Sequence, residues 1–442
     1  MMRFARTGSW CAALAISLTV ILTGCTEEEP TGIGGDLLPG GNIETFEVVL
    51  EPEQYLVFDT AFSGYTRAST TGILLAARDF EGVFNANTLV RFSRPPETIS
   101  VRNSAGNVVT DTMPTYFGGE IIVRIDTALS TSNGTAPIAA YTIGEEWHAT
   151  SATWTDRVDT TGVRLPWAQA GGTRGVLLGR SARTAGDTVF IPIDSAAIAD
   201  WADLDTDVRG AIIALDPDAA TAAGERIRLT GLTLRLHARS SIDTDTIVEV
   251  FANPTAATFV FDPRPPATAP PIRVGGVPAW RTFMEFRDDL RNLEVPCASI
   301  GPTCTVRLGD ADITKAELLL ESVAAPDGFA PEDSVALQAG VVLRLANVPL
   351  ERSPLTNTRA DDQFDPARVS PEAFRGGVST IVRLPMSLYF RALTADDVEE
   401  DRRPSRAIAL MTSPESSTAG FATFARRPRL RLILTVDPEV VR

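Results

Sequence analysis

The amino-acid sequence predicts an all-β protein built from two tandem domains of related fold. Short segments in which every second residue is apolar run along the chain, as Phe46, Val48 and Leu50 show. Turn-forming pairs such as Glu51-Pro52 and Gly118-Gly119 separate these segments. This alternation with Gly and Pro punctuation is typical of a sandwich or barrel. The same order of segments returns after roughly 200 residues, which indicates a domain duplication because solenoid repeats are much shorter.

The best-defined pattern is a strand, a short helix and two further strands at 187–236. The first strand ends in Ile191-Pro192-Ile193, and Asp194 or Ser195 then caps a predicted helix that contains Ile198 and Trp201. The two later strands are apolar, at 211–215 and 232–236. Proline cannot donate a hydrogen bond to a neighbouring strand, so the first strand is expected at a sheet edge or at a bulge.

The second half repeats this pattern. Leu384-Pro385-Met386 ends a strand before Ser387, and apolar strands follow at 407–410 and 430–434. The leucines of both closing strands should face a core, with Arg235 and Arg431 on the other side, where a charge is less costly. The two halves, 46–240 and 241–437, are therefore predicted to superpose with one strand order.

Residues 1–24 have the composition of a targeting segment. Arg3 and Arg6 precede an apolar stretch that is too short to span a membrane as a helix. The stretch ends in Leu22-Thr23-Gly24-Cys25, which resembles the lipobox of bacterial lipoproteins. The resemblance implies cleavage before Cys25, a lipid on that cysteine, and an outer-membrane location because Thr26 rather than Asp follows. The alternative is an ordinary signal peptide with a chance cysteine.

The stretch behind the lipobox cysteine, 25–45, is predicted to be a flexible tether. Its Gly- and Pro-rich part has the composition of a flexible linker. The acidic run Glu27–Glu29 is either a surface-export signal or a solvated part of the tether. The predicted partner is a membrane, which several acyl chains would hold at about 0.8 kcal/mol per buried CH₂.

Charge and cysteine content limit the partners further. The formal net charge is -16, so nucleic acid and anionic headgroups are not expected partners. With Cys11 in the leader and Cys25 lipidated, Cys297 and Cys304 remain of the four cysteines. An even pair in an exported protein predicts a disulfide that closes a small loop.

Part of the first half resembles the DNRLRE, or disaggregatase-related, β-sandwich domain. Four features carry the resemblance: Trp147, Thr153-Trp154, the strand 189–194 and Trp201. It covers roughly residues 87–238 and implies a jelly-roll-like sandwich on exported proteins, akin to carbohydrate-binding modules, without a catalytic residue. The second half lacks the Thr-Trp feature, so its predicted fold depends on the internal repeat alone. The predicted architecture is thus two tandem jelly-roll-like sandwiches behind a lipidated tether.

Few residues offer ligand-binding or catalytic chemistry. His148 beside Trp147, and Trp167 in a loop after Pro166, are the candidate ligand-binding residues, with burial in the fold as the alternative for each. No Gly-x-Ser-x-Gly elbow is present, and adjacent acids such as Glu145-Glu146 point to opposite faces of a strand. The protein is therefore expected not to be an enzyme.

The alternating acids Asp203, Asp205 and Asp207 are the candidate metal ligands. They could supply three oxygens to a structural Ca²⁺, although a calcium loop's glycine and terminal glutamate are missing. A polar turn is the alternative, and no cofactor is expected otherwise.

These observations predict a non-enzymatic binding or structural lipoprotein of the outer membrane. A carbohydrate-binding or adhesion role is the alternative, with a glycan or surface protein as partner. A glycan-active enzyme is the third hypothesis, and it would need two carboxyl groups facing each other about 5 to 9.5 Å apart.

Overall fold

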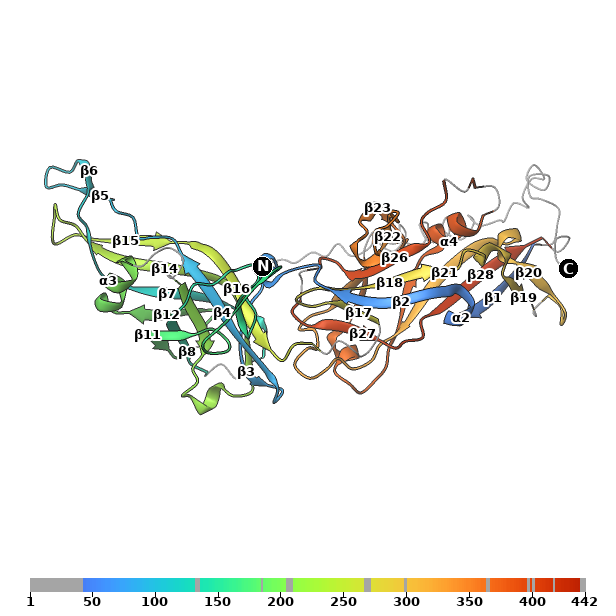
Figure 1. Ribbon diagram of the computed structural model, residues 1–442, viewed down its shortest axis with the longest axis horizontal. Coiled ribbons are helices and arrows are strands. Elements are labelled where there is room, and N and C mark those ends of the chain that lie inside the picture. The colour runs from blue at the N-terminus through green and yellow to red at the C-terminus, as the bar shows by residue number, and fades with distance from the viewer. Residues whose placement is uncertain are drawn as a thin grey trace, which may run out of the picture.

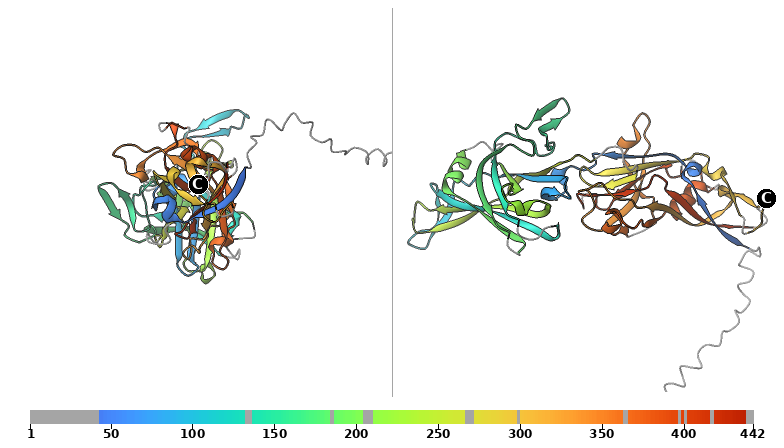
Figure 2. Two further views of the ribbon diagram at one scale, coloured as in Figure 1. Left: turned by 90° about the vertical axis from the view of Figure 1, so that its right-hand side faces the viewer. Right: turned by 90° about the horizontal axis from the view of Figure 1, so that it is seen from below.

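The protein forms two β-sandwiches that lie end to end along its long axis (Figure 1). The right-hand view of Figure 2 shows the same two lobes from below, and the left-hand view looks along the long axis, where one lobe covers the other. The computed structural model describes residues 43–437, apart from 132–135, 184–185, 204–209, 266–271, 298–299, 363–365, 396–397, 400–401 and 416–417. The expected leader and most of the expected tether lie outside the described residues. The prediction of an all-β sandwich fold is confirmed.

Sandwich 1 has two antiparallel layers. The first layer runs in the order β11 (Arg174–Ser181), β8 (Ile138–Ile143), β13 (Gly210–Leu215), β4 (Phe84–Phe92) and β16 (Pro254–Asp262). The second runs in the order β12 (Thr188–Ile193), β7 (Thr115–Thr131), β14 (Glu225–Arg239) and β15 (Ile247–Ala252), with β3 (Leu74–Phe80) beside the start of β14. Two hairpins project from it, β5 (Ile99–Arg102) with β6 (Val108–Asp111) and β9 (Asp156–Thr160) with β10 (Val163–Pro166).

Sandwich 2 has the same order of strands. Its first layer runs β23 (Leu355–Arg359) and β24 (Ala367–Val369), both beside β22 (Val335–Val342), then β26 (Ala407–Thr412), β18 (Trp280–Phe286) and β2 (Leu56–Ser63). Its second runs β25 (Ile381–Pro385), β21 (Asp312–Glu321), β28 (Arg429–Val436) and β1 (Glu44–Leu50). Beside these layers, β17 (Ile272–Gly275) pairs with β27 (Phe421–Phe424), and β19 (Glu294–Pro296) pairs with β20 (Thr305–Arg307).

The helices among the described residues are short. The α-helices are α2 (Pro52–Tyr55), α3 (Ser195–Asp203) and α4 (Ser387–Thr394). The 3₁₀ helices are η1 (Ala68–Thr70), η2 (Ala220–Ala222), η3 (Leu290–Asn292), η4 (Leu308–Asp310), η5 (Leu350–Arg352) and η6 (Pro371–Phe374). The predicted helix after the proline strand is α3, and the Asp194 carboxylate caps it by accepting from the Ala197 amide at 2.8 Å.

The closing strands β14 and β28 turn their leucines toward the cores, as predicted. Leucines 232, 234 and 236 of β14, and 430, 432 and 434 of β28, are buried in the two cores. Among the described residues, β12 with Pro192 pairs with β7 alone, and β25 with Pro385 pairs with β21 alone. In both edge strands the proline stands opposite a glutamate, Glu120 or Glu317. The repeated proline therefore marks the same place in both sandwiches.

A buried threonine supports the common fold at a second place. Thr88 of β4 donates its hydroxyl to the Leu75 carbonyl, and Thr282 of β18 donates to the Arg273 carbonyl, each at 2.8 Å. In both sandwiches this bond ties the strand to the preceding hairpin partner, β3 or β17.

The expected domain limits of 46–240 and 241–437 differ from the residues that build each sandwich. Strands β1 and β2 open the chain yet pair with β28 and β18 of sandwich 2. Strands β15 and β16 open the second repeat yet pair with β14 and β4 of sandwich 1. Sandwich 1 is thus built from one continuous stretch, 74–262, and sandwich 2 from 44–63 together with 272–436. Alternation places an apolar face on each of these strands but does not specify which sheet receives it.

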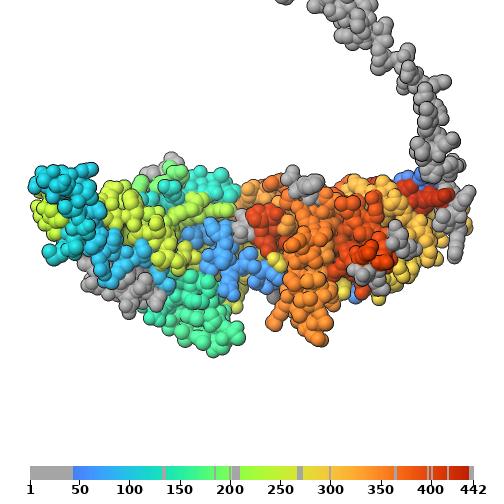
Figure 3. Space-filling view, turned by 90° about the horizontal axis from the view of Figure 1, so that it is seen from above, coloured from blue at the N-terminus to red at the C-terminus, as the bar shows by residue number. Residues whose placement is uncertain are grey.

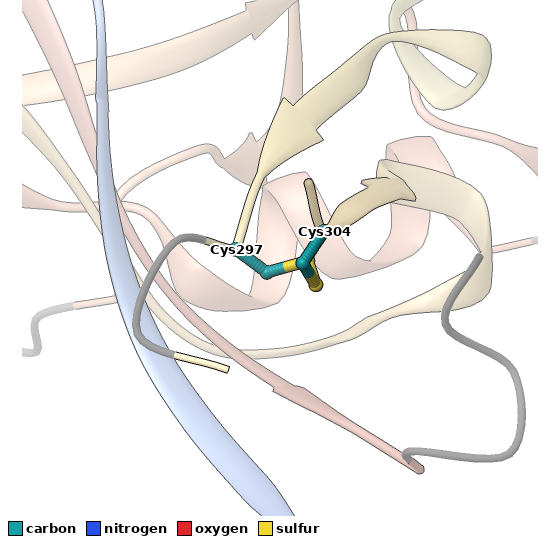
Figure 4. The surroundings of a disulfide bond; sticks show 2 residues. All are labelled: Cys297 and Cys304. Carbon is teal, nitrogen blue, oxygen red and sulfur yellow. A yellow bond between two sulfur atoms is a disulfide. The ribbon is translucent and has the colours of Figure 1, made fainter. Parts of the chain in front are cut away.

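The predicted disulfide is present. Cys297 and Cys304 are bonded, with Cα atoms 5.0 Å apart, at the end of the β19–β20 hairpin (Figure 4). Both cysteines are buried at the edge of the sandwich 2 core.

Candidate functional site

The candidate ligand-binding tryptophan, Trp167, is buried and not an exposed stacking platform. It is 6% exposed and packs in a cluster with Trp147 and Leu89 on the outer side of the β4 layer. Its indole Nε1 donates to the Thr153 carbonyl at 2.9 Å, and its amide donates to the Thr155 carbonyl at 3.0 Å. The preceding Pro166 suggested a loop, but the cluster beneath that loop covers the ring.

The second candidate, His148, is exposed and closes a tight turn. Its ring Nδ1 lies 3.0 Å from the Ser151 hydroxyl, and its carbonyl accepts from the amides of Ser151 and Ala152. The Ser151 hydroxyl also accepts from the Asp159 amide at 3.3 Å. These contacts are those of a turn that holds its own backbone, and Ser151 borders the cleft described below.

The candidate metal site is only partly described. Asp203 is the last residue of α3, whereas Asp205 and Asp207 lie outside the described residues. Within the described part of the chain, no three His, Cys, Asp or Glu side chains gather as a metal site would require.

The neighbouring acids Asp361 and Asp362 accept hydrogen bonds from backbone amides and so have structural roles. Asp361 accepts from the Ala339 amide at 2.7 Å, and Asp362 accepts from the Leu388 amide at 2.9 Å and from the Ser387 amide, so it caps α4.

A concavity that both sandwiches line lies at their junction. It has a volume of about 450 Å³ and is lined by more apolar than polar surface. Its lining comes from the two connectors between the sandwiches, from the 150–154 turn and β16 of sandwich 1, and from residues 277–280 of sandwich 2. Figure 3 shows the junction between the lobes, with the blue residues of the first connector beside it. The volume falls within the range of small-molecule sites.

Two half-buried tryptophans line this junction cleft, one from each sandwich. Trp154 is held from behind by Gly171, whose amide donates to the Trp154 carbonyl at 2.7 Å. Gly171 has φ +82°, and a Cβ there would lie 2.8 Å from the indole, so a larger residue would be strained and would displace the ring. Trp280 covers the buried Arg273, whose guanidinium lies 4.5 Å from its ring centroid and 4.4 Å from that of Phe421. Both rings are therefore fixed by the fold around them.

Polar groups surround the two rings. Arg67, Arg264, Asp159 and Thr150 are exposed at the cleft, and the half-buried Ser151 also lines it.

Behind them lies the Asp156 carboxylate, which accepts from Thr155 at 2.7 Å and from Arg164 at 2.8 Å and lies 3.9 Å from Arg264. The hydrogen bond from Arg164 lowers the pKa of Asp156 to about 2, against the opposing effect of desolvation. This network fixes the loop that carries Trp154.

The two walls of the cleft belong to a tightly joined interface. Phe84 of sandwich 1 packs edge-on against Phe329 of sandwich 2, with ring centroids 5.4 Å apart, and Phe329 stacks on Phe421 at 5.2 Å. Arg226 and Glu332 form an ion pair between the sandwiches at 3.5 Å, and both side chains are almost fully buried. The geometry of the cleft is thus set by packed groups from both lobes.

Sequence patterns alone did not single out Trp280 or the cleft. Trp280 follows the turn at Val277-Pro278, but Trp154 on the other wall lies more than one hundred residues away in the chain. The Thr-Trp pair at 153–154 carries part of the family resemblance, and in the structure it also supplies one cleft wall.

Comparisons with known proteins leave the family of this chain open. No protein-family model and no curated protein matches it, so the expected DNRLRE membership has no support from these comparisons. A crystal structure described as a presumed secreted protein from Parabacteroides distasonis ATCC 8503 is 11% identical, covers 88% of this chain and 99% of its own, and has a TM-score of 0.21. A structure from the Gx strain of infectious bursal disease virus is 10% identical, covers 91% and 75%, and has a TM-score of 0.12. Likeness at these scores carries no argument about fold or function.

Length and polarity decide whether a helix can span a membrane. Among the described residues, no helix is long and apolar enough to cross a bilayer.

Proposed function

We propose that this protein is a non-enzymatic, lipid-anchored binding protein of the outer membrane, and that the junction cleft binds carbohydrate. The observation that supports the proposal is the pair of tryptophans, Trp154 and Trp280, at one cleft of about 450 Å³. Sugar rings present flat apolar faces together with hydroxyls at their edges. Aromatic walls with hydrogen-bonding groups around them match both features.

The chemistry at the cleft favours binding over catalysis. The Ser151–His148 contact closes a turn. Asp156 is already occupied by Arg164 and Thr155. Its lowered pKa keeps it ionised, so it is a poor proton donor for glycosidic cleavage.

The proposal is tested by titrating the protein with a panel of soluble oligosaccharides and following tryptophan fluorescence and heat. For a sugar that binds, Trp154→Ala and Trp280→Ala should each weaken the affinity about tenfold, the equivalent of about 1.4 kcal/mol. The Trp→Phe variants should retain most of the affinity, because the ring remains.

A matched control lies on another surface of sandwich 1. Phe251 is 55% exposed on β15 and does not line the cleft, so Phe251→Ala should leave the affinity unchanged. The proposal is wrong if no oligosaccharide binds, or if the two tryptophan variants bind as the unchanged protein does. In that event a purely structural or protein-binding role would be favoured.

A further inference from the structure

The two sandwiches exchange their opening strands. Each repeat begins with a strand pair, β1–β2 or β15–β16, and each pair completes the sandwich formed mainly by the other repeat. The chain crosses the junction after β2, through residues 64–73, and again after β16. In Figure 1 β1 and β2, in blue, lie among the late, yellow-to-red strands of sandwich 2.

The two strand pairs occupy equivalent places. Val49 of β1 stands opposite Arg431 of β28, and Phe251 of β15 stands opposite Arg235 of β14. In both places a glutamate two residues earlier on the exchanged strand pairs with that arginine. The two cases differ only in which repeat supplies the strand.

The ion pairs show the match in detail. Arg431 binds Glu47 of β1 through Nη2 at 2.7 Å and Glu317 of β21 through Nη1 at 2.7 Å. In sandwich 1, Arg235 binds Glu120 of β7 and Glu249 of β15, the latter at 3.5 Å. The exchanged strand thus supplies one acid of a Glu–Arg–Glu group in each sandwich, and this group selects its register.

The segment from β1 to β2 is held in sandwich 2 by many contacts. Phe46, Val48 and Leu50 point into the core, and Tyr55 is fully buried against Phe286, with ring centroids 6.0 Å apart. The Tyr55 hydroxyl donates to the Pro428 carbonyl at 2.7 Å. These contacts are all non-covalent, and one connector joins the segment to the rest of the described chain.

We propose that the surface of β28 and β18 covered by β1 and β2 is a strand-docking site that also accepts β1–β2 from a second copy of this chain. Reciprocal exchange between two copies keeps every strand pairing, so the exchanged dimer differs from the monomer in the path of the 64–73 connectors and in the contacts that these connectors make. Exchange of an identical element is a low-cost route to a dimer. The acid at position 47 and the arginine at position 431 make the second copy a matching partner.

The test uses two full-length chains in which Cys11 and Cys25 are serine, so that the other cysteines are the bonded 297–304 pair. One chain carries Thr45→Cys and a tag, and the other carries Thr435→Cys. Thr45 and Thr435 are register partners whose hydroxyls lie 3.3 Å apart. In the first route, the mixture is unfolded and refolded over a range of protein concentrations. In the second route, the folded proteins are incubated together. After either route the mixture is oxidised and run on a non-reducing gel.

The expected result is a disulfide-linked mixed dimer whose yield rises with concentration and falls with Glu47→Ala. The matched control pairs Thr45→Cys with Arg239→Cys on the second chain. Arg239 stands opposite Ile247, the sandwich 1 equivalent of Thr45, so it would be linked only if β1 entered sandwich 1. A single chain with both Thr45→Cys and Thr435→Cys should close internally at low concentration. A mixed-dimer yield no greater than that of the Arg239→Cys control, by both routes, would overturn the proposal.

Discussion

At the residue scale, a buried ion pair, Arg226–Glu332, contributes to the junction beside the packed phenylalanines. Arg226 also lies over the Phe80 ring at 4.3 Å, and the Thr418 hydroxyl donates to Glu332 at 2.5 Å. A buried charge is tolerated only while its partner is present. This pair joins β14 of sandwich 1 to a loop of sandwich 2, so losing one member affects the packing between the sandwiches.

Glu332→Ala should therefore destabilise the protein by about 3 to 5 kcal/mol, because it leaves Arg226 buried without its counter-charge. The measurement is the urea midpoint together with calorimetry. The double variant Arg226→Met/Glu332→Leu, which removes both charges, should recover most of the loss. Equal destabilisation by the single and double variants would show that the shape of these side chains, and not their charge, stabilises the junction.

Asp156, next to the cleft, makes a pH-dependent contribution to the stability of the folded protein. Its pKa is lowered to about 2, first by the hydrogen bond from Arg164, whereas an unfolded aspartate titrates near 3.9. Because the pKa of Asp156 is lower in the folded state, its charged carboxylate stabilises the fold at pH values above the unfolded pKa. This stabilisation is lost as the pH falls toward the folded pKa.

Asp156→Asn should thus lower the urea midpoint at pH 7, and the difference from the unchanged protein should shrink between about pH 4 and pH 2. Fluorescence of the nearby tryptophans gives a local readout of the same change. A difference that stays constant over this range would mean that the carboxylate does not stabilise the loop in its charged form.

At the scale of elements, local sequence signals predicted several pieces well. The edge prolines 192 and 385, the capped helix α3 and the disulfide hairpin are where the sequence placed them. Each depends on chemistry within a few residues: a missing amide hydrogen, a capping carboxylate, or two cysteines in one loop. The cleft is different, since its tryptophans come from separate elements of two sandwiches.

The disulfide should stabilise the β19–β20 hairpin by restricting the unfolded chain. Its cysteines are 7 residues apart in sequence, and a loop of this size corresponds to roughly 2 to 3 kcal/mol. The double variant Cys297→Ala/Cys304→Ala should lower the melting temperature accordingly, as calorimetry would show. Thiol labelling of the unfolded, unreduced protein is the control: labelling at both positions would mean that the bond does not form.

At the scale of the whole molecule, the first and last described strands, β1 and β28, pair with each other. A tether that ends at Glu44 therefore joins sandwich 2, at the level of Val436, rather than sandwich 1. If Cys25 carries the proposed lipid, sandwich 2 is the lobe whose first strand follows the tether directly. Sandwich 1 is attached to sandwich 2 through the two connectors and the packed junction.

Cys25→Ala should release the protein from the membrane fraction into the soluble fraction, because acyl chains supply the anchoring energy. Cell fractionation and mass spectrometry of the N-terminal peptide measure this. Cys11→Ala, in the predicted leader, is the matched control and should leave the protein in the membrane fraction. Unchanged retention of the Cys25 variant, with no lipid mass on the peptide, would contradict the proposed anchor.

The sequence by itself determined the strand-rich fold, the repeated order of strands, the edge prolines and the cysteine pair. These follow from side-chain period, backbone chemistry and composition, which act over short stretches. Only the tertiary structure decided that β1–β2 and β15–β16 cross to the opposite sandwich, that Trp167 is buried, and that Trp154 and Trp280 line one cleft. Two related repeats offer nearly identical sheets to each strand pair, so local pattern cannot choose between them. That choice depends on the connectors and on contacts between residues far apart in the chain.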